Sequence, residues 1–523
     1  MSNKINTSKS YLGIELGSTR IKAVLIDDTF TPIANASHEW ENKLENGYWT
    51  YSLEAIHKGI QNCFADLSRN VESNYGQSLT TVGAIGISGM MHGYLAFDAD
   101  ENLLTPFRTW RNTTTACASK ELTELFDFNI PQRWSIAHLY QAIIDREEHV
   151  SKVARITTLA GYIHFLLTGT HEVGIGEASG MFPVKNTDYD SEMISKFNDL
   201  VAQKGYDLNI RAILPIVKMA GSSGTVLSEQ GAKFLDPSGR LLPGIPMCPP
   251  EGDAGTGMTA TNAVLPKTGN ISAGTSIFAM LVLDKPLKNL YPEIDVVTTP
   301  DGDPVAMVHC NNCSSELDAW VRLFAEFSSL AGTELDRSRV YELLFTHSLS
   351  ADADCGKLCA YNYLSGEHIT GVESGKPMYF RTPDSDMTLA NFMRAQLYST
   401  MSTLKIGMDI LFENEDITAE CFMAHGGLFK TKGVAQQILS DAMKTPVSVM
   451  DTAGEGGAWG MALLAAYMML KKGKKLGQWL AEDVFERMNT TTLTPSDIGA
   501  KGFDEYITRY KLGLDSQKRL AEV

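Results

Sequence analysis

Two short apolar runs separated by polar residues stand out near the start of the chain. Gly13–Leu16 and Ile21–Ile26 are apolar or β-branched, which predicts two strands, and the residues Gly17–Arg20 between them predict a tight turn. The glycine leads into a second strand, whereas the glycines of a Walker loop or a dinucleotide-binding turn lead into a helix. The pattern therefore predicts a β-hairpin with a polar tip.

The same order of residues returns in the second half of the chain, where Gly269–Asp284 repeats the pattern of Leu12–Asp27. At a constant offset, Gly17 corresponds to Gly274 and Asp27 to Asp284. One copy at the start of each half predicts two related lobes, although glycine with small polar residues is also generic turn chemistry. Glycine lets a backbone approach an oxyanion closely, while N–H groups and hydroxyls donate to it. The turn residues expected to hold a polyphosphate from both sides are Gly17, Ser18, Thr19, Gly274, Thr275 and Ser276.

The two copies differ at a pair of charged positions. Glu15 and Lys22 of the first copy are replaced by Ser272 and Ala279 in the second. Mg²⁺ prefers a carboxylate together with waters and phosphates, so Glu15 is a candidate metal ligand and Lys22 a candidate phosphoryl contact. The alternative is an ordinary ion pair at a strand edge, which is less favoured for Glu15 because its neighbours are apolar.

Length and composition indicate a globular chain of two domains. The chain has 523 residues, of which 44% are hydrophobic and 20% charged. A chain of this length is longer than one that usually folds around a single hydrophobic core. Prolines cluster between Pro243 and Pro250, which places the boundary near residue 247. We expect an N-terminal domain over residues 1–247 and a C-terminal domain over 248–523.

Charge and hydropathy restrict the partners. Asp and Glu outnumber Lys and Arg by 62 to 45, and the net charge of −17 disfavours binding to nucleic acid or to anionic lipid. The opening residues lack an apolar signal core, and the longest apolar stretch, Ala458–Leu470, is too short to span a bilayer. These features predict a cytoplasmic protein without a membrane or nucleic-acid partner.

The cysteines do not form a recognisable framework. Eight are scattered along the chain, and the single CxxC pair, Cys310 and Cys313, has no second pair to complete a zinc site. A polar loop beside a strand is the preferred interpretation of this pair, with metal or redox duty as the alternative.

Asp253 is the candidate general base. It follows Pro249 and Pro250 and precedes a run of small residues that predicts a helix, so its structural alternative is the N-cap of that helix. Gly252 and Gly255 flank it and leave room for a ligand. A carboxylate at a helix N-terminus stays ionised and can accept a proton from a hydroxyl that attacks phosphorus, so the two roles are compatible.

Two further segments are candidates for sugar binding. Met91 and His92 lie between glycines after a predicted strand, where soft apolar area beside a donor and acceptor suits a small polyol. Trp110 and Asn112 add an aromatic face and an amide. The alternatives are a structural histidine and a core tryptophan.

The pair Gly426-Gly427 lies between an apolar strand and a helix with period near 3.6. Glycines at such a junction allow a flat ring to lie on the backbone, although a glycine pair alone is weak evidence for a nucleotide contact. The segment that begins at Asp451 and runs into the apolar stretch carries small residues that suit close helix packing on a sheet.

Taken together, the chain resembles the FGGY carbohydrate kinases and, among them, the xylulokinase group. The resemblance covers nearly the whole length, and the combination of MHG, GD and GTS is its specific part. The motifs that carry it are the hairpin Gly13–Ile26, Met91-His92-Gly93, Glu177–Gly180, Gly252-Asp253, Ala273–Ser276, Tyr363–Glu367, Gly426-Gly427 and the segment Phe503–Leu514.

The resemblance implies an α/β fold with two actin-like, ribonuclease-H-like lobes, whose mixed sheets are flanked by helices and close on ATP. It implies Asp253 as general base and Mg²⁺ with the γ-phosphate at Glu15 and the first turn. Contacts are implied between Met91, His92 and a ketose, and a homodimer is the implied assembly. For the sugar, the remaining implied contacts are Glu177, Trp110, Asn112 and Asp253. For ATP, they are Lys22, Thr275 and Thr431, with Gly427 beneath adenine.

The chain also departs from the family pattern. Glu15 stands where Asp is usual, residues Trp110–Thr114 replace WNDGR, and the first signature is altered around His138 and Gln141. D-xylulose is the expected acceptor, while L-xylulose, ribulose, a polyol or an aldonate such as gluconate remain open because pocket geometry decides configuration. From another class, an actin-like regulatory ATPase without a sugar acceptor, or an inactive sugar sensor, would carry the same hairpins.

Overall fold

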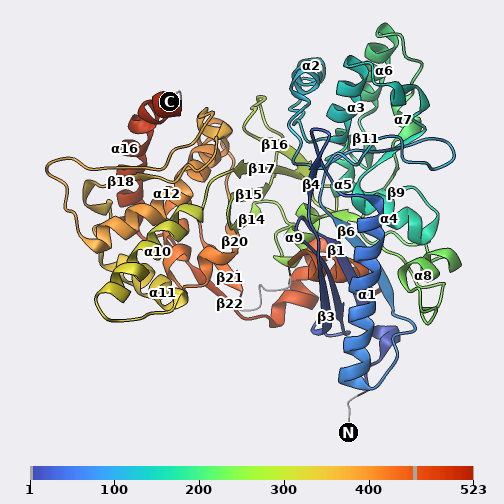
Figure 1. Ribbon diagram of the computed structural model, residues 1–523, viewed down its shortest axis with the longest axis horizontal. Coiled ribbons are helices and arrows are strands. Elements are labelled where there is room, and N and C mark those ends of the chain that lie inside the picture. Colours follow the sequence, from blue (N-terminus) through green and yellow to red (C-terminus); the bar gives the residue numbers. More distant parts are fainter. Residues whose placement is uncertain (1–3, 451–455, 522–523) are drawn as a thin grey trace. The chain divides into compact units, whose positions relative to one another are not determined.

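The predicted hairpin is the centre of the first sheet. In the computed structural model, which describes residues 4–450 and 456–521, β1 (Tyr11–Leu16) pairs antiparallel with β2 (Arg20–Ile26) and parallel with β6 (Ala84–Gly89). The sheet has the order β13-β6-β1-β2-β3, with β3 at Pro32–Glu39 and β13 at Glu251–Gly252 (Figure 1). This mixed sheet confirms the hairpin and the α/β class.

The chain divides into two compact units, which are discontinuous in sequence. Unit 1 comprises residues 1–265, 295–305 and 454–487, and unit 2 comprises residues 266–294, 306–453 and 488–523. The assignment of separate ligand-binding duties to residues 1–247 and 248–523 stays a prediction.

Both faces of the first sheet are covered within unit 1. Leu12, Ile14 and Leu16 are fully buried in one core together with side chains of α1 (Leu53–Tyr75) and α4 (Leu159–Thr168). On the other face, α14 (Gly456–Leu470) lies so close that a Cβ on Gly13 would overlap the main chain of Ala458. The expectation of close packing is confirmed for this helix, while residues 451–455 lie outside the described part.

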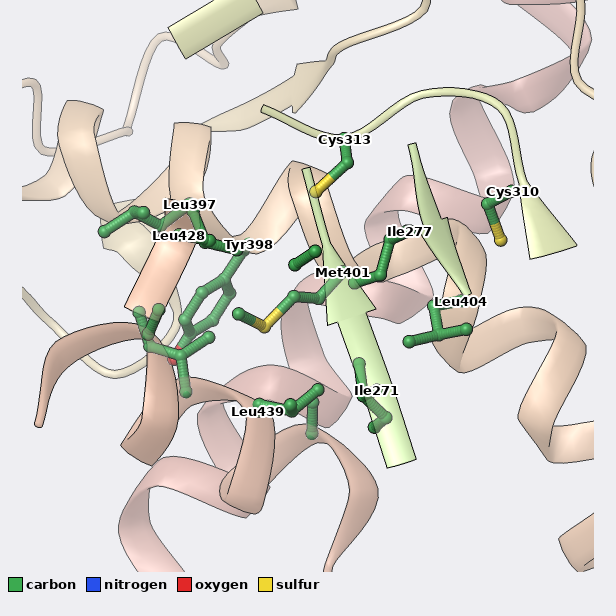
Figure 2. Packing of buried hydrophobic residues seen from close by; sticks show 14 of the residues in the cluster. Ile271, Ile277, Cys310, Cys313, Leu397, Tyr398, Met401, Leu404, Leu428 and Leu439 are labelled. Atoms are coloured by element: carbon green, nitrogen blue, oxygen red, sulfur yellow. The ribbon is translucent and has the colours of Figure 1, made fainter. Parts of the chain in front are cut away.

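Unit 2 contains a second sheet built on the second hairpin. β14 (Thr268–Ala273) pairs antiparallel with β15 (Ile277–Val282) and parallel with β20 (Cys421–His425). The order continues as β17-β15-β14-β20-β21-β22, with β17 at Pro304–Cys310, β21 at Val447–Met450 and β22 at Thr490–Leu493. Figure 2 shows Ile271 and Ile277 of this hairpin against Met401 of α12 (Leu389–Asp409) and Leu439 of α13 (Val434–Met443).

The two hairpins match in topology but differ by one residue in register. Leu16 pairs with Ile21 in the first, so four residues form its turn, whereas Ala273 pairs with Ile277 in the second, where only three residues do. The structural correspondence between the two copies therefore follows the constant sequence offset in the first strand and is shifted by one residue in the second strand. In consequence Phe278, rather than Ala279, occupies the position of Lys22 beside the first strand.

The other elements surround these sheets. In unit 1 they are α2 (Ala116–Phe126), α3 (Ser135–Ile144), α5 (Ile175–Ala178), α6 (Ser191–Gln203), α7 (Ile210–Ile213), α8 (Glu229–Leu235), α9 (Asp253–Ala260), α15 (Leu476–Trp479), β4 (Lys43–Glu45), β5 (Tyr48–Thr50), β7 (Leu95–Phe97), β8 (Arg155–Thr157), β9 (Glu172–Gly174), β10 (Val184–Lys185), β11 (Asp188–Tyr189), β12 (Ile216–Lys218) and β16 (Asp295–Thr298). In unit 2 they are α10 (Ser315–Leu330), α11 (Arg337–His347), β18 (Cys359–Tyr361), β19 (Met378–Phe380) and α16 (Asp497–Ala521). Of the helices in the described ranges, none has both the length and the apolar content needed to cross a membrane.

Candidate active site

Aromatic side chains hold the carbonyl groups of the first turn. The Trp40 indole N–H donates to the Gly17 carbonyl at 2.7 Å, and the Tyr51 hydroxyl donates to the Ser18 carbonyl at 2.6 Å. In a trans peptide the carbonyl and the following N–H point in opposite directions, so the N–H groups of Ser18 and Thr19 point away from these donors. The two aromatic rings stack with centroids 4.2 Å apart. This geometry leaves the N–H side of the turn free of these donors, and binding of an anion there stays a prediction.

The second turn uses the same arrangement with different donors. The Ser314 hydroxyl and N–H donate to the Gly274 carbonyl at 2.6 and 3.1 Å, and the Cys313 N–H donates to the Thr275 carbonyl at 2.9 Å. The N–H groups of Thr275 and Ser276 therefore point away from residues 313–314. Sequence analysis missed the holding residues of both turns; the cluster of aromatic residues over 40–51 was the available signal for the first.

The CxxC pair belongs to this loop. Cys310 and Cys313 are buried, and burial raises the pKa of the Cys313 thiol to about 12, so it stays protonated at neutral pH. Over the described residues, no cluster of three or more His, Cys, Asp and Glu side chains is suited to a metal ion. Cys310 ends β17 and Cys313 lies in the loop that follows, so the predicted loop beside a strand is present.

Asp253 is the first residue of α9, and its Oδ1 accepts the Met91 N–H at 3.1 Å. The N-cap of the helix is Gly252, and no side chain caps it, so the predicted N-cap alternative for Asp253 is wrong. Its side chain is exposed, yet dense surrounding protein raises the pKa of its carboxyl by desolvation, against the lowering effect of the Met91 and Ala254 N–H groups. A solvent-accessible carboxylate with one oxygen held in place can accept a proton.

The loop after β6 places His92 close to this aspartate. Its backbone has a φ of 71°, and Nδ1 lies 3.1 Å from the Gly180 carbonyl, to which it donates, so Nε2 is left as the acceptor. Burial lowers the pKa of His92 well below its usual range, so the ring is neutral. A Cβ on Gly180 would come within 2.6 Å of Nδ1, so this position requires glycine.

Buried carboxyl groups surround the Gly252-Asp253 junction. Glu177 is fully buried, and burial raises the pKa of its carboxyl well above the usual value. Glu251 accepts the Gly252 N–H at 3.0 Å and the N–H groups of Gly176 and Glu177, while burial raises its pKa to about 7. The Glu251 carboxyl thus joins strand β13 to the start of α5, which carries Glu177.

Glu15 belongs to the same charge cluster. It faces Lys22 across the hairpin and accepts the Ala458 N–H of α14. Burial and the nearby Asp253 raise the pKa of Glu15 to about 7, and Lys22 opposes that rise. The predicted metal ligand and the predicted base thus lie close enough in unit 1 to influence each other's ionisation.

Trp110 and Asn112, which the sequence assigns to sugar binding, form hydrogen bonds within the protein. The Trp110 indole N–H donates to the Ser18 hydroxyl at 3.2 Å, which places this 37% exposed ring beside the first turn. Asn112 donates to the carbonyls of Trp49 and Thr109 and accepts the Trp49 N–H at 2.8 Å. Both donors of the Asn112 amide are therefore engaged, and its contact with a sugar stays a prediction.

The glycine pair after β20 adjoins the second hairpin in unit 2. Gly426 has a φ of 112°, and a Cβ there would overlap the Ala273 carbonyl. A Cβ on Gly427 would meet no atom within 4 Å, so this glycine borders open space. Thr431 follows in the loop before α13. The residues predicted to bind ATP in unit 2 therefore lie on connected segments, and Gly274 as well as Gly427 borders open space.

Comparison with known proteins places this chain. The model of the N-terminal domain of the FGGY family of carbohydrate kinases matches residues 10–204, and that of the C-terminal domain matches residues 269–469. A xylulose kinase of Haemophilus influenzae is 22% identical over 524 residues, 96% of this chain and 98% of that protein.

Solved structures share the fold. Xylulose kinase from Rhodospirillum rubrum aligns with a TM-score of 0.79 at 17% identity, over 98% of this chain and 100% of that one. Gluconate kinase from Lactobacillus acidophilus aligns with a TM-score of 0.78 at 17% identity, over 98% and 99%. These likenesses confirm the expected two-lobed, actin-like α/β fold class. With the matches to both domain models, they show that the chain belongs to the FGGY family of carbohydrate kinases and is a sugar-phosphorylating phosphotransferase.

Proposed function

We propose that this kinase transfers the γ-phosphoryl group of ATP to a ketopentose, with D-xylulose as the first candidate. The family implies a sugar and ATP as substrates, and the related proteins named above include xylulose kinases. The observation that carries the proposal is the Asp253 carboxylate, which the Met91 N–H holds beside the neutral His92.

In this proposal Asp253 orients the attacking hydroxyl and takes its proton. Met91 and His92 contact the sugar, with His92 Nε2 accepting a sugar hydroxyl because Nδ1 is engaged by Gly180. The N–H groups of the two turns bind the phosphates. A loose transition state needs alignment and charge stabilisation more than a strong base, so the turns supply most of the rate enhancement.

The residues around Glu15 fit a magnesium ion. Glu15 and Asp253 raise each other's energy when both are ionised, and a divalent cation between phosphate and carboxylate would relieve that repulsion. Bound Mg²⁺ would offset the charge of the phosphates, and Glu15 would hold it while Lys22 contacts the phosphoryl oxygens.

Charge near Asp253 favours a neutral acceptor over an aldonate. An ionised acceptor would need an unpaired cation, but Arg133, whose charge reaches Asp253, already forms an ion pair with Asp295. Burial raises the pKa of the nearby Glu15, Glu177 and Glu251 carboxyls, so the negative charge that an acceptor would meet is chiefly that of Asp253. An aldonate would therefore meet like charge at the base.

The test is ADP release with D-xylulose, L-xylulose, ribulose, xylitol, gluconate and glycerol, with Asp253→Asn as the matched control. We expect D-xylulose to give the highest kcat/KM and the variant to lose the acceptor-dependent rate. Faster turnover with gluconate would refute the charge argument. ADP release that no acceptor stimulates would refute the proposed function as a whole.

A further inference from the structure

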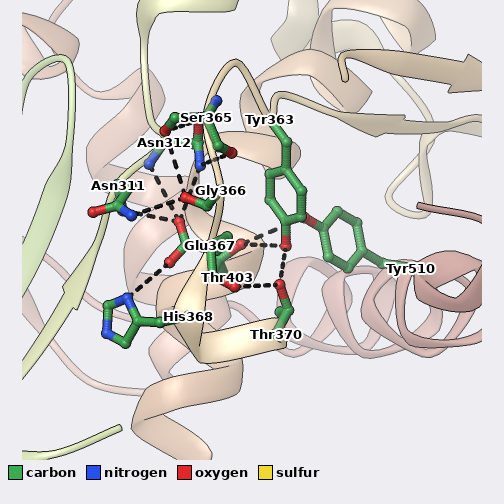
Figure 3. Close-up of polar contacts among 10 residues, drawn as sticks. All are labelled: Asn311, Asn312, Tyr363, Ser365, Gly366, Glu367, His368, Thr370, Thr403 and Tyr510. Carbon is green, nitrogen blue, oxygen red and sulfur yellow. Dashed lines mark hydrogen bonds and ion pairs between the residues drawn. The ribbon is translucent and has the colours of Figure 1, made fainter. Parts of the chain in front are cut away.

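Two motifs remain without a role in this scheme: the YLSGE segment Tyr363–Glu367 and the loop between Cys310 and Cys313. They bind each other in unit 2 (Figure 3). Glu367 is 1% exposed, and its Oε2 accepts the Asn311 N–H at 2.8 Å, the Asn312 N–H at 3.3 Å and the Asn312 amide at 3.2 Å. One buried carboxylate oxygen thus holds two successive residues of the loop.

Asn312 returns these bonds. Its Oδ1 accepts the N–H groups of Leu364 and Ser365 at 2.9 and 3.0 Å and the Ser365 hydroxyl at 3.1 Å. The Asn311 amide donates to the Gly366 carbonyl at 2.8 Å. The two segments are therefore joined by reciprocal side-chain to main-chain bonds over about fifty residues of sequence, and we call this set of bonds the Asn312–Glu367 clasp.

The clasp ends directly at the second turn. The next residue after Asn312 is Cys313, whose N–H holds the Thr275 carbonyl, and Ser314 holds the Gly274 carbonyl. The Asn362 amide, just before YLSGE, donates to the Cys313 carbonyl at 2.7 Å and fixes the same residue from its other side. Glu367 is thus linked to the turn by hydrogen bonds to Asn311 and Asn312, by the main chain from Asn312 to Ser314, and by the hydrogen bonds of Cys313 and Ser314.

The direction of the N–H groups in the turn depends on this path. Each held carbonyl sets the plane of its peptide, and that plane sets the direction of the next N–H, here those of Thr275 and Ser276. In the first turn the side chains of Trp40 and Tyr51 bond to the carbonyls directly.

We propose that Glu367 and Asn312 are positioning residues that act through Cys313 and Ser314 to aim the N–H groups of the second turn at the phosphates of the nucleotide. This inference rests on the proposed role of that turn in binding ATP. The clasp does not touch substrate in the scheme; it keeps the donors aligned, and displacement of a binding group by about 1 Å can cost about a hundredfold in rate.

A matched control lies in the same unit. Glu415 is also fully buried and also clamps a loop, accepting the N–H groups of Lys288 and Asn289 and the Tyr291 hydroxyl, but none of these residues bonds to the second turn. Glu367→Ala and Glu415→Ala therefore remove comparable buried clamps, and only the first should affect the turn.

The experiment measures the dissociation constant of ADP by calorimetry, and the kcat/KM for ATP and for the sugar, in Glu367→Ala, Asn312→Ala, Glu367→Gln and Glu415→Ala. We expect the two clasp alanines to weaken ADP binding about tenfold or more and to lower kcat/KM for ATP, with the KM for the sugar changed less than about twofold. Glu415→Ala should lower the melting temperature without changing ADP affinity. Glu367→Gln should retain most of the parental ADP affinity, because an amide oxygen can accept the hydrogen bonds that Oε2 accepts.

Equal loss of ADP affinity in Glu367→Ala and Glu415→Ala, or no loss in either, would overturn the inference. If Glu367→Ala does not fold, Asn312→Ala decides, since it removes only an amide. ADP binding needs no acceptor, so the outcomes separate from those of the proposed function. If ADP affinity depends on the clasp but no sugar is phosphorylated, the clasp inference stands and the sugar kinase scheme is refuted. If a sugar is phosphorylated but ADP affinity does not depend on the clasp, only the clasp inference is refuted.

Discussion

The pH dependence of Glu251 offers a quantitative test of the buried carboxyl cluster in unit 1. Burial raises its pKa from 4.5 to about 7 in the folded protein. Between these two values the folded chain binds more protons than the unfolded chain, so the free energy of unfolding falls as the pH rises. One pKa unit corresponds to about 1.4 kcal/mol, which makes the full loss about 3 kcal/mol, most of which falls between pH 5 and pH 8.

The perturbation is Glu251→Gln, which keeps the shape and removes the ionisation. The difference in unfolding free energy between variant and parent should move by about 2–3 kcal/mol in favour of the variant between pH 5 and pH 8, because groups that do not interact with Glu251 contribute equally in both proteins. Urea unfolding at pH 5, 6.5 and 8 measures it, with Glu45→Gln as the same change at an exposed position of β4. A variant whose stability runs parallel to the parent across this range would refute the reasoning.

Four other substitutions test the remaining contacts. Asp253→Ala should lower kcat by about 10²–10⁴ in the ADP-release assay, and turnover at the parental rate would remove Asp253 from the role of base. Tyr51→Phe loses the bond to the first turn, worth about 1 kcal/mol, so the KM for ATP should rise about fivefold with the sugar KM unchanged. Gly426→Ala places a side chain against the Ala273 main chain at positive φ, so the melting temperature should fall, with a loss of about 1–3 kcal/mol in the free energy of unfolding. Gly427→Ala enters open space; its melting temperature should stay at the parental value while ATP binding weakens, and normal ATP affinity would argue against a ring at this glycine.

The hairpins and their sheets could be predicted from sequence because their signals are local. Alternation between apolar runs and a glycine-led turn predicts a strand-turn-strand unit at residues 12–27 and again at 269–284, and a hairpin is present at each place. The register of the second hairpin could not be predicted in the same way. A turn of three or of four residues suits the same sequence, and the choice is made by packing, which moved Phe278 into the position expected for Ala279.

The site itself depends on contacts that no local pattern contains. The Met91 N–H donates to the Asp253 carboxylate across 162 residues of sequence. This carboxylate was expected to cap α9, but the N-cap of the helix is Gly252. Sequence analysis assigned Asn112 to the sugar because of its residue type, whereas its amide is engaged by the main chain of Trp49. A residue's chemistry can be predicted from sequence, but its partners follow from the fold.

The repeated hairpin shows how one fold element acquires two tasks. Both turns have their carbonyls held from one side, which leaves their N–H groups on the other, so the proposed anion binding rests on a geometry that the two turns share. Beside the first turn stand Glu15 and Lys22, whereas Ser272 and Phe278 occupy these positions beside the second. A carboxylate next to a phosphate-binding turn is costly unless a cation joins it, so in our proposal a metal ion would bind beside the first turn. Ser272 and Phe278 bring no charge to the second turn, so in our proposal it binds phosphate through the N–H groups and hydroxyls of Thr275 and Ser276, and the buried Glu367 carboxyl keeps those N–H groups aimed.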